Sequence, residues 1–437
     1  MRSLIRDHVH AARALARRPG FTAVALFTLA LGIGANTAVF SVVNGIVLNR
    51  LPYREPERLV ALGNYFISNA ELLYLQENMR SFGQVAAYSP GWEMPLTSGG
   101  EPERVTAARV STNFLGMLGV APGRGRDFAA EEAAPGRGDV ALMDFTLWQT
   151  RFGGDPAIVG QAVMLDGTPT TVVGILPRDF RFYSETPAHF LLPIAIDPAS
   201  RFHRGQNALA FARLAPGATL SGAAAELRTH VPSIRDALGF AADYGRDLTV
   251  LSLHDYLVGP VRTMLFVVLG AVGFIVLIAA ANVGNLLLVR TAERRREIAV
   301  RVALGASRWR VIRGLMAESV LLALGGSVAG LGLALGGVAM LRRLLPADTP
   351  RLAEVAVDGR VLLLCVAVGA LTGLVGVLPA LVATREDPHE ALRSGRGSDP
   401  AGRRGRRLRG AFVAVEIALA LVLVVGAGLM LRTLGRL

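Results

Sequence analysis

The sequence predicts a membrane protein with about five transmembrane helices and one α+β extracytoplasmic domain. The chain of 437 residues is 52% hydrophobic and only 18% charged, which is typical of a protein that faces lipid over much of its surface. Its apolar runs flank a long stretch, residues 49–260, in which no run could span a bilayer. That stretch holds 18 Arg against 22 acidic residues, so the excess of positive charge lies beside the apolar runs. The charge pattern therefore indicates cytoplasmic loops and argues against nucleic-acid binding.

Composition also excludes several kinds of chemistry. All 46 basic residues are arginine, so the chain offers no lysine for a P-loop or a Schiff base. Cys365 is the only cysteine, which excludes an internal disulfide and a cysteine zinc site. The seven histidines are scattered, and no nucleophile elbow occurs. We therefore expect no catalytic residue, no bound metal and no cofactor on this chain, and do not expect it to be an enzyme.

Five apolar runs are long enough to cross a membrane. We expect them at 21–48, 261–289, 314–341, 361–383 and 411–431. Residues 1–20 have apolar positions at helical spacing among arginines, which predicts an amphipathic segment on the membrane surface. Asn36, Thr37, Ser41 and Asn44 cluster in the second half of the first run. They either face other helices or emerge beyond the membrane.

The loops between these runs differ in charge, and the difference predicts orientation. Residues 290–313 carry 8 Arg against two Glu, and the linker 384–410 is also strongly basic. The loop 342–360 is nearly balanced. The positive-inside rule places the N-terminus and both basic segments in the cytoplasm. Residues 49–260 and the short loop 342–360 are then extracytoplasmic, and in a bacterial inner membrane the large domain is periplasmic.

The extracytoplasmic stretch mixes strand and helix patterns without a parallel βαβ repeat, which favours an α+β fold. Strands are expected at 58–65, 104–110, 140–143, 162–165, 170–175 and 208–214, and helices at 70–79, 112–118, 147–152 and 220–231. Asp166 and Gly167 form a hairpin-turn signal between two of the strands. Thr219 is a candidate N-cap of the last helix.

Small residues recur at four-residue spacing in two membrane runs. The pairs are Gly326 and Gly330, Gly332 and Gly336, and Gly369 and Gly373. This spacing places both glycines on one helix face and permits close helix packing. Glu318 and Glu416 lie near the cytoplasmic starts of their runs. Each either snorkels to the interface, pairs with a nearby arginine, Arg313 or Arg409, or forms a proton or cation site.

The basic segment after the second apolar run has a pattern of its own. Apolar positions at helical spacing stop at a run of small residues and resume before the third apolar run, which predicts a helix, a tight turn and a second helix. Its candidate functional residues are Glu297, Ile298, Arg301, Ala303, Gly305, Ala306, Ser307 and Arg308. Such a compact knob could enter a groove on a partner protein. An interfacial hairpin anchored by arginine is the alternative.

Several motifs carry a resemblance to a known family. The basic segment reads Arg-Glu-Ile-Ala-Val-Arg-Val-Ala-Leu-Gly-Ala-Ser from Arg296 to Ser307 and is followed by Glu318-Ser319. Further motifs are Arg18-Pro19-Gly20-Phe21-Thr22, Leu51-Pro52-Tyr53 and Leu147-Trp148-Gln149. With them the chain resembles the MacB/FtsX-like permeases of ABC transporters, above all the duplicated, acidobacterial-type orphan permeases. The resemblance implies a MacB-like periplasmic core domain and a half-length or truncated form of the duplicated permease.

The resemblance also implies a function. Residues Glu297 to Arg308 would form the loop that docks on a separate cytoplasmic ABC ATPase, which would supply ATP and Mg²⁺. ATP hydrolysis would then move the periplasmic domain and drive efflux by mechanotransmission. The expected partners are that ATPase, a second copy of the chain or a second permease half, membrane lipids and a periplasmic protein. The alternative is a regulatory membrane protein that controls a periplasmic partner, such as a cell-wall hydrolase, without transport.

Overall fold

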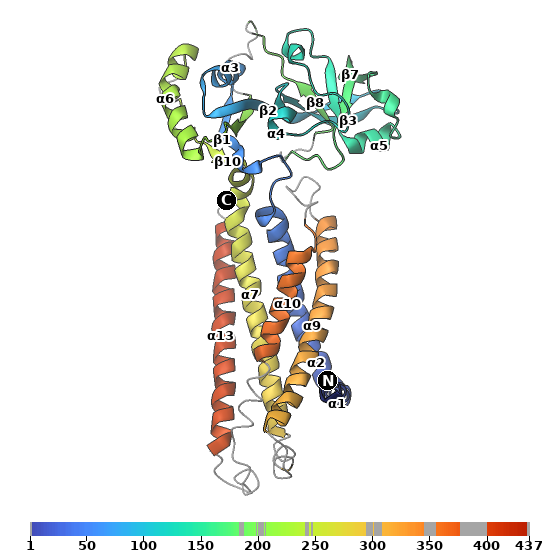
Figure 1. The fold of residues 1–437 in the computed structure, drawn as a ribbon, viewed down its shortest axis with the longest axis vertical. Helices are drawn as coiled ribbons and strands as arrows, with labels where there is room; N and C mark the ends of the chain where they lie inside the picture. Colours follow the sequence, from blue (N-terminus) through green and yellow to red (C-terminus); the bar gives the residue numbers. More distant parts are fainter. Residues whose placement is uncertain are drawn as a thin grey trace. The chain divides into compact units, whose positions relative to one another are not determined.

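The computed structural model describes the chain except residues 1, 183–187, 198, 200–204, 206, 241–243, 246–247, 294–299, 301–307, 345–354, 376–399 and 435–437. The chain divides into two compact units (Figure 1). The helical unit comprises residues 1–48, 262–346 and 351–437. The sheet unit comprises residues 49–261.

The helical unit is built from long apolar helices. Its elements are α1 (Arg2–Ala16), α2 (Pro19–Val43), the π-helical turn η1 (Asn44–Leu48), α7 (Leu253–Glu293, which begins in the sheet unit), α9 (Arg308–Leu344), α10 (Gly359–Val375) and α13 (Pro400–Leu434). Among the described residues, four helices are long and apolar enough to span a membrane: Pro19–Leu48, Val261–Arg290, Ile312–Met340 and Arg409–Gly428. α10 is an apolar helix of 17 residues, and the rest of the predicted span 361–383 lies outside the described residues.

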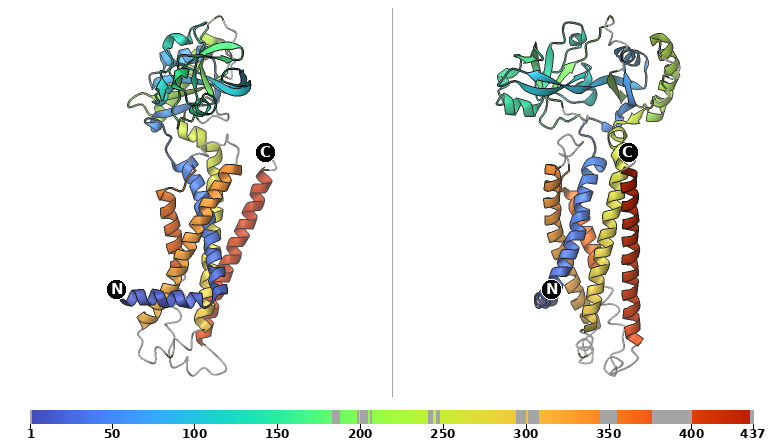
Figure 2. Two further views of the ribbon diagram at one scale, coloured as in Figure 1. Left: turned by 90° about the vertical axis from the view of Figure 1, so that its right-hand side faces the viewer. Right: turned by 180° about the vertical axis from the view of Figure 1, so that it is seen from behind.

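The first helices of this unit are arranged in two directions. α1 crosses the end of the helical bundle instead of running along it (Figure 2). Ala11 is buried, and of the apolar positions at helical spacing in α1, Leu15 is buried whereas Val9 and Ala12 are exposed. In the second half of α2, Asn36, Thr37 and Ser41 are buried, so they face the rest of the unit. Asn44 is buried as well, and whether this part of α2 lies within the membrane or beyond it stays a prediction.

The sheet unit is a mixed sheet with helices on its surface. Its strands are β1 (Leu59–Ile67), β2 (Phe82–Leu96), β3 (Glu103–Val110), β4 (Arg124–Gly125), β5 (Val140–Met143), β6 (Ala162–Leu165), β7 (Thr168–Ile175), β8 (Phe190–Pro193), β9 (Ala208–Leu214) and β10 (Leu251–Ser252). Its helices are α3 (Asn69–Asn78), α4 (Phe114–Leu118), α5 (Phe145–Arg151) and α6 (Leu220–Leu238).

The strand order is β10-β1-β9-β2-β3-β8-β5-β7-β4, and β6 pairs with β2 and β7. Only the pairs β3–β8 and β5–β7 are parallel among the described pairs. α3 and α6 pack on one end of the sheet through Leu72 and Leu227, and α5 packs on the other end through Trp148 (Figure 1). A third cluster centres on Phe114 of α4. The structure confirms the predicted fold class, with apolar helices and an α+β domain.

Two predictions that depend only on residues close together in the sequence are confirmed in this unit. Asp166 and Gly167 both have positive φ, 49° and 74°, as a two-residue hairpin turn between β6 and β7 requires. Thr219 caps α6, because its hydroxyl accepts the Gly222 N–H at 3.1 Å. The strand β2 was not predicted, because Pro90, Gly91 and Pro95 interrupt its pattern.

Candidate functional site: the ends of the coupling segment

The predicted coupling loop itself lies almost wholly outside the described residues. That holds for Glu297, Ile298, Arg301, Ala303, Gly305, Ala306 and Ser307. Arg308 is the first residue of α9, and α7 ends at Glu293. The structure therefore describes the two helix ends from which the loop departs, and the polar contacts there define the candidate site.

Arg290 and Glu318 form a buried ion pair between the two helices. Arg290 Nη1 lies 3.2 Å from Glu318 Oε2, with side chains only 4% and 7% exposed. Arg290 is the last residue of the span on α7, and Glu318 lies in the span on α9. A buried charge is costly unless it is paired, so each residue depends on the other. The pair therefore joins α7 and α9 close to the point where both lead into the loop.

The same arginine also holds the N-terminal helix. Arg290 Nη2 donates to the carbonyl of Ala14 on α1 at 3.0 Å, and its guanidinium lies 4.8 Å from the ring centre of Phe21 on α2. We call Arg290, Glu318, Ala14 and Phe21 the Arg290 joint. Arg18 adds an exposed ion pair to Glu293 at 2.5 Å. Four helices thus meet at one buried cation.

This joint has no direct signal in the sequence. The charge pattern places Arg290 in the basic loop, and sequence proximity favours Arg313 as the partner of Glu318, whereas the structure pairs Glu318 with Arg290. The two residues of the pair belong to different helices separated by the loop, so helical spacing could not relate them. An isolated carboxylate inside an apolar run was the available signal, because such a group needs a partner.

Close glycine contacts lie on the path from this joint along α9. A Cβ on Gly34 of α2 would lie 2.9 Å from the carbonyl oxygen of Gly330, and a Cβ on Gly330 would lie 3.1 Å from the Gly34 nitrogen. A Cβ on Gly326 would lie 2.6 Å from Leu29 Cβ. The backbones of α2 and α9 therefore approach so closely that only glycine fits at Gly34 and Gly330 without displacement.

The other predicted glycine pairs behave differently from each other. Positions 369 and 373 on α10 face α9, because added Cβ atoms would lie 2.1 Å from Ser327 Oγ and 3.2 Å from Ala323 Cβ. At Gly332 and Gly336 on α9, no atom of the described residues lies within 4 Å of an added Cβ. The packing role of Gly332 and Gly336 stays a prediction.

A second polar contact joins η1 to α10. Asn44 Nδ2 donates to Asp358 Oδ2 at 2.8 Å, and Asp358 Oδ1 accepts the N–H groups of Arg360 and Val361 at 3.0 Å each. The hydrogen bond from Val361, together with those from Asn44 and Arg360, holds the pKa of Asp358 below its ordinary value. This contact connects the end of α2 to the start of α10.

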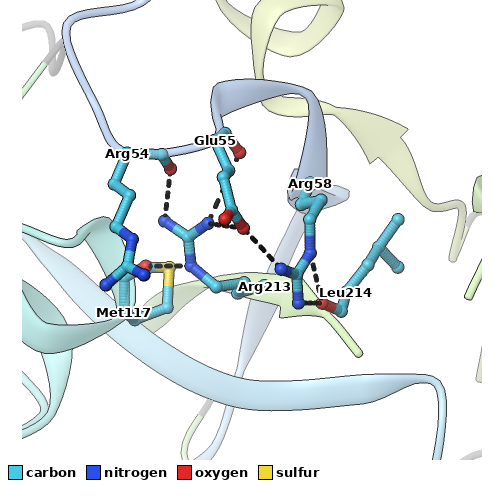
Figure 3. A network of polar contacts seen from close by, with 6 residues as sticks. All are labelled: Arg54, Glu55, Arg58, Met117, Arg213 and Leu214. Atoms are coloured by element: carbon cyan, nitrogen blue, oxygen red, sulfur yellow. Dashed lines mark hydrogen bonds and ion pairs between the residues drawn. The ribbon is translucent and has the colours of Figure 1, made fainter. Parts of the chain in front are cut away.

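In the sheet unit, an arginine makes hydrogen bonds to the segment that follows η1 in the chain (Figure 3). Arg213 of β9 donates to the carbonyls of Arg54 at 2.7 Å and Met117 at 2.8 Å. Its side chain is 12% exposed, and Glu55 lies 3.8 Å away. Burial lowers the pKa of the Arg213 guanidinium, and the positive charge of Arg58 adds to the effect. We call this cluster the Arg213 joint.

Arg58 extends the Arg213 joint along the same segment. Its Nε and Nη2 donate to the Leu214 carbonyl at 3.1 and 2.7 Å, and it pairs with Glu55. The short segment that precedes β1 is therefore fixed to the end of β9 and to α4. Each of the two joints connects segments of the chain that are distant in sequence.

Two protein families match the chain in succession. The model of the MacB-like periplasmic core domain matches residues 22–230, and the model of the FtsX-like permease C-terminal domain matches residues 269–388. The chain belongs to the MacB/FtsX-like permeases. The permease is embedded in the membrane and carries a periplasmic domain, which is the sheet unit.

Curated relatives from this family match the chain at modest sequence identity. The permease is 28% identical over 330 residues to the macrolide export ATP-binding/permease protein MacB of Sodalis glossinidius, covering 71% of this chain and 47% of that protein. It is 26% identical over 238 residues to the uncharacterized ABC transporter permease YknZ of Bacillus subtilis, covering 54% and 57%. The chain thus spans about half the length of the curated relatives it matches.

Among solved structures, the periplasmic region of MacB from Actinobacillus actinomycetemcomitans matches 51% of this chain and 97% of its own, with 9% identity and a TM-score of 0.35.

Proposed function

We propose that this permease is the membrane component of an ABC exporter and passes movement from an ATPase to its periplasmic domain. The observation that carries the proposal is the Arg290 joint, in which one buried ion pair connects α7 and α9 beside the loop between them. A push on that loop acts on both helices together because the pair resists their separation. The relatives named for macrolide and pyoverdine export support export as the class of activity.

The ATPase contact is assigned to the loop residues Glu297, Ile298, Arg301, Ala303, Gly305, Ala306, Ser307 and Arg308. Absence of lysine from this chain supports an ATPase elsewhere, because the phosphate-binding loop needs one. In the curated MacB relatives, ATP-binding and permease functions are named for one protein, of which this chain covers about half. The ATP and Mg²⁺ would therefore bind a partner subunit.

The remaining features of the proposal follow from charge and family. The N-terminus, the segment 290–313 and the linker 384–410 face the cytoplasm, and the loop 342–360 faces the periplasm. The permease works as a homodimer or with a second permease half, and belongs to the duplicated, acidobacterial-type subfamily. A periplasmic partner receives the movement or the cargo.

The test is purification of the tagged chain in mild detergent from its native membranes, with ATP hydrolysis measured on the eluate. We compare the parent with Gly305→Trp, which places a large side chain at the tip of the loop. Gly270→Trp on α7 is the matched control, because among the described residues nothing lies within 4 Å of an added Cβ there.

The proposal expects an ABC ATPase and vanadate-sensitive ATP hydrolysis with the parent and with Gly270→Trp. Gly305→Trp should lose at least about nine-tenths of both, because a bulky group at a packed contact is poorly tolerated. Equal recovery of the ATPase with all three chains would contradict the loop assignment. Recovery with none, from folded and abundant protein, would contradict the exporter assignment.

A further inference from the structure

A cavity of about 390 Å³ lies in the sheet unit and is lined by none of the residues of the Arg213 joint. Its wall is formed by segments distant in sequence: the start of α3, the strands β2 and β3, residues 135–136, residues 194–197 and Asn207. β2, β3 and β8 lie side by side in the sheet (Figure 1). The volume falls within the range of small-molecule pockets. The lining includes Asn69, Ser89, Trp92, Arg109, Asp197 and Asn207.

In the lining of the cavity, the guanidinium of Arg109 lies over the indole ring of Trp92. The Cζ atom of Arg109 lies 5.0 Å from the ring centre of Trp92. Arg109 has no carboxylate within 4.0 Å among the described residues, and its guanidinium makes no hydrogen bond to them. Elsewhere on the same strand, Arg104 pairs with Glu93 at 2.8 Å. The stacked guanidinium therefore keeps its hydrogen-bond donors available on the cavity side.

A bulge in β2 creates this geometry. The pairing of β2 with β3 shifts between Ser89 and Trp92, and Ser89 lies opposite Arg109 in the register. A Cβ on Gly91 would lie 2.7 Å from Thr106 Cγ2, so a larger residue could not occupy the bulge without displacement. A bulge re-aims the side chains beside it, which here brings Trp92 and Arg109 to one wall.

The polar lining offers further donors. Asn207 lines the cavity, and its side-chain amide makes no hydrogen bond to the described residues. Asn69 Nδ2 donates to the Ala195 carbonyl at 3.2 Å, which fixes that part of the wall. The site thus combines an indole surface, a free amide and a guanidinium whose planar donors match a carboxylate.

We propose that this cavity binds a carboxylate carried on an apolar or aromatic body, with Arg109 holding the carboxylate and Trp92 the apolar part. The inference goes beyond the proposed exporter function and does not depend on ATP coupling. A peptide C-terminus and a small organic acid share this chemistry. Asp197, on the same lining, adds repulsion for an anion and so limits the affinity.

The test is calorimetric titration of the full chain in detergent micelles with N-acetylphenylalanine and with its carboxamide. The two probes differ only in the charged group. Parent protein should bind the acid about 10- to 100-fold more tightly than the amide, which is the usual gain from a hydrogen-bonded charge. Arg109→Gln should reduce that ratio to about one, while Arg104→Gln, on the same strand, should keep it.

Asp197→Asn is a variant that is expected to keep or gain binding of the acid. A loss of folding would abolish binding and therefore cannot produce that result. It should bind the acid at least as tightly as the parent does, since a negative charge is removed. No binding of the acid to folded parent protein, equal binding of acid and amide, or an unchanged ratio in Arg109→Gln would each overturn the proposal. Binding of acetylglycine-phenylalanine equal to that of N-acetylphenylalanine would assign peptide C-termini as ligands, and tighter binding of the smaller acid would assign small acids.

Discussion

The Arg290 joint and the Arg213 joint use the same residue type in two different environments. Arg290 lies in the helical unit with its side chain 4% exposed, and its charge is balanced by Glu318, whose side chain is 7% exposed. Arg213 lies in the sheet unit and is satisfied mainly by backbone carbonyls, with the half-exposed Glu55 at 3.8 Å. The first joint depends on charge pairing and the second on hydrogen-bond geometry.

This difference predicts which partner matters at each site. In an apolar surrounding, the loss of one charge leaves the other unpaired, and the cost is large. At the sheet unit, water can replace a lost carboxylate, and ion pairs of this kind contribute little. The carboxylate should therefore be essential at the Arg290 joint, and the arginine itself should be essential at the Arg213 joint.

The largest effect is expected for Glu318→Gln. The change leaves the Arg290 charge buried without its carboxylate, which costs about 3–5 kcal/mol. Thermal unfolding in detergent, followed by size-exclusion chromatography with fluorescence, should show a strongly lowered midpoint. The double variant Arg290→Met with Glu318→Leu should recover most of the loss, because apolar pairs often replace buried ion pairs at little cost. A double variant as unstable as Glu318→Gln would contradict the charge-pairing account.

Arg213→Met should have the next largest effect. It removes donors to the Arg54 and Met117 carbonyls, and each hydrogen bond to a charged group contributes about 1.5–3 kcal/mol. Hydrogen exchange in residues 51–58 should rise by at least about tenfold. Glu55→Gln is the matched variant and should change stability by less than about 1 kcal/mol. Equal effects of the two variants would remove the distinction between the joints.

Gly330→Ala should lower stability by about 1–3 kcal/mol, since its new methyl group meets the backbone of α2. Gly332→Ala lies two residues away, where no described atom lies within 4 Å of an added Cβ. That control should be neutral or slightly stabilising, because alanine is the better helix former. The measurement is the thermal unfolding midpoint of both variants and the parent. A neutral Gly330→Ala together with a destabilised Gly332→Ala would show that α2 and α9 do not pack as described.

The smallest expected effect concerns pH. The pKa of Asp358 lies below its ordinary value of 3.8, so the stability that its hydrogen bonds provide is present above that pH and is lost as the pH falls through the lowered pKa. Asp358→Asn should therefore be less stable than the parent by about 0.5 kcal/mol at pH 6. The difference should shrink towards pH 3. A constant difference in unfolding midpoint across this range would show that the charge plays no part.

Much of the fold could be predicted because its signals are local. The turn at Asp166 and Gly167 and the cap at Thr219 depend on residues within a few positions of each other. β2 was not predicted because two prolines and the bulge at Gly91 interrupt the alternation of apolar and polar residues. Its pairing with β3 and β9, which is tertiary, makes it a strand. The short β8 was missed for a similar reason, since its partners β3 and β5 are distant in sequence.

The candidate site was predictable only in part. Glycine spacing marked Gly326 and Gly330, whose contacts with α2 the structure describes, but spacing alone could not tell them from Gly332 and Gly336. The partners of Arg290 and Arg213 come from other elements and are fixed by tertiary packing, which a single sequence does not report. The loop from Glu297 to Ser307 stays a prediction from family resemblance and charge.

We propose that movement driven by ATP reaches the periplasmic domain through the coupling loop and the Arg290 joint. The measurement is hydrogen exchange in the assembled complex, with and without ATP, Mg²⁺ and vanadate. Nucleotide should change exchange in residues 51–58, beside Arg213, in the parent complex, and the change should be smaller in the ATPase-bound double variant Arg290→Met with Glu318→Leu, whose loop is unaltered. ATP hydrolysis by the parent complex with no change in exchange anywhere in the sheet unit would contradict it.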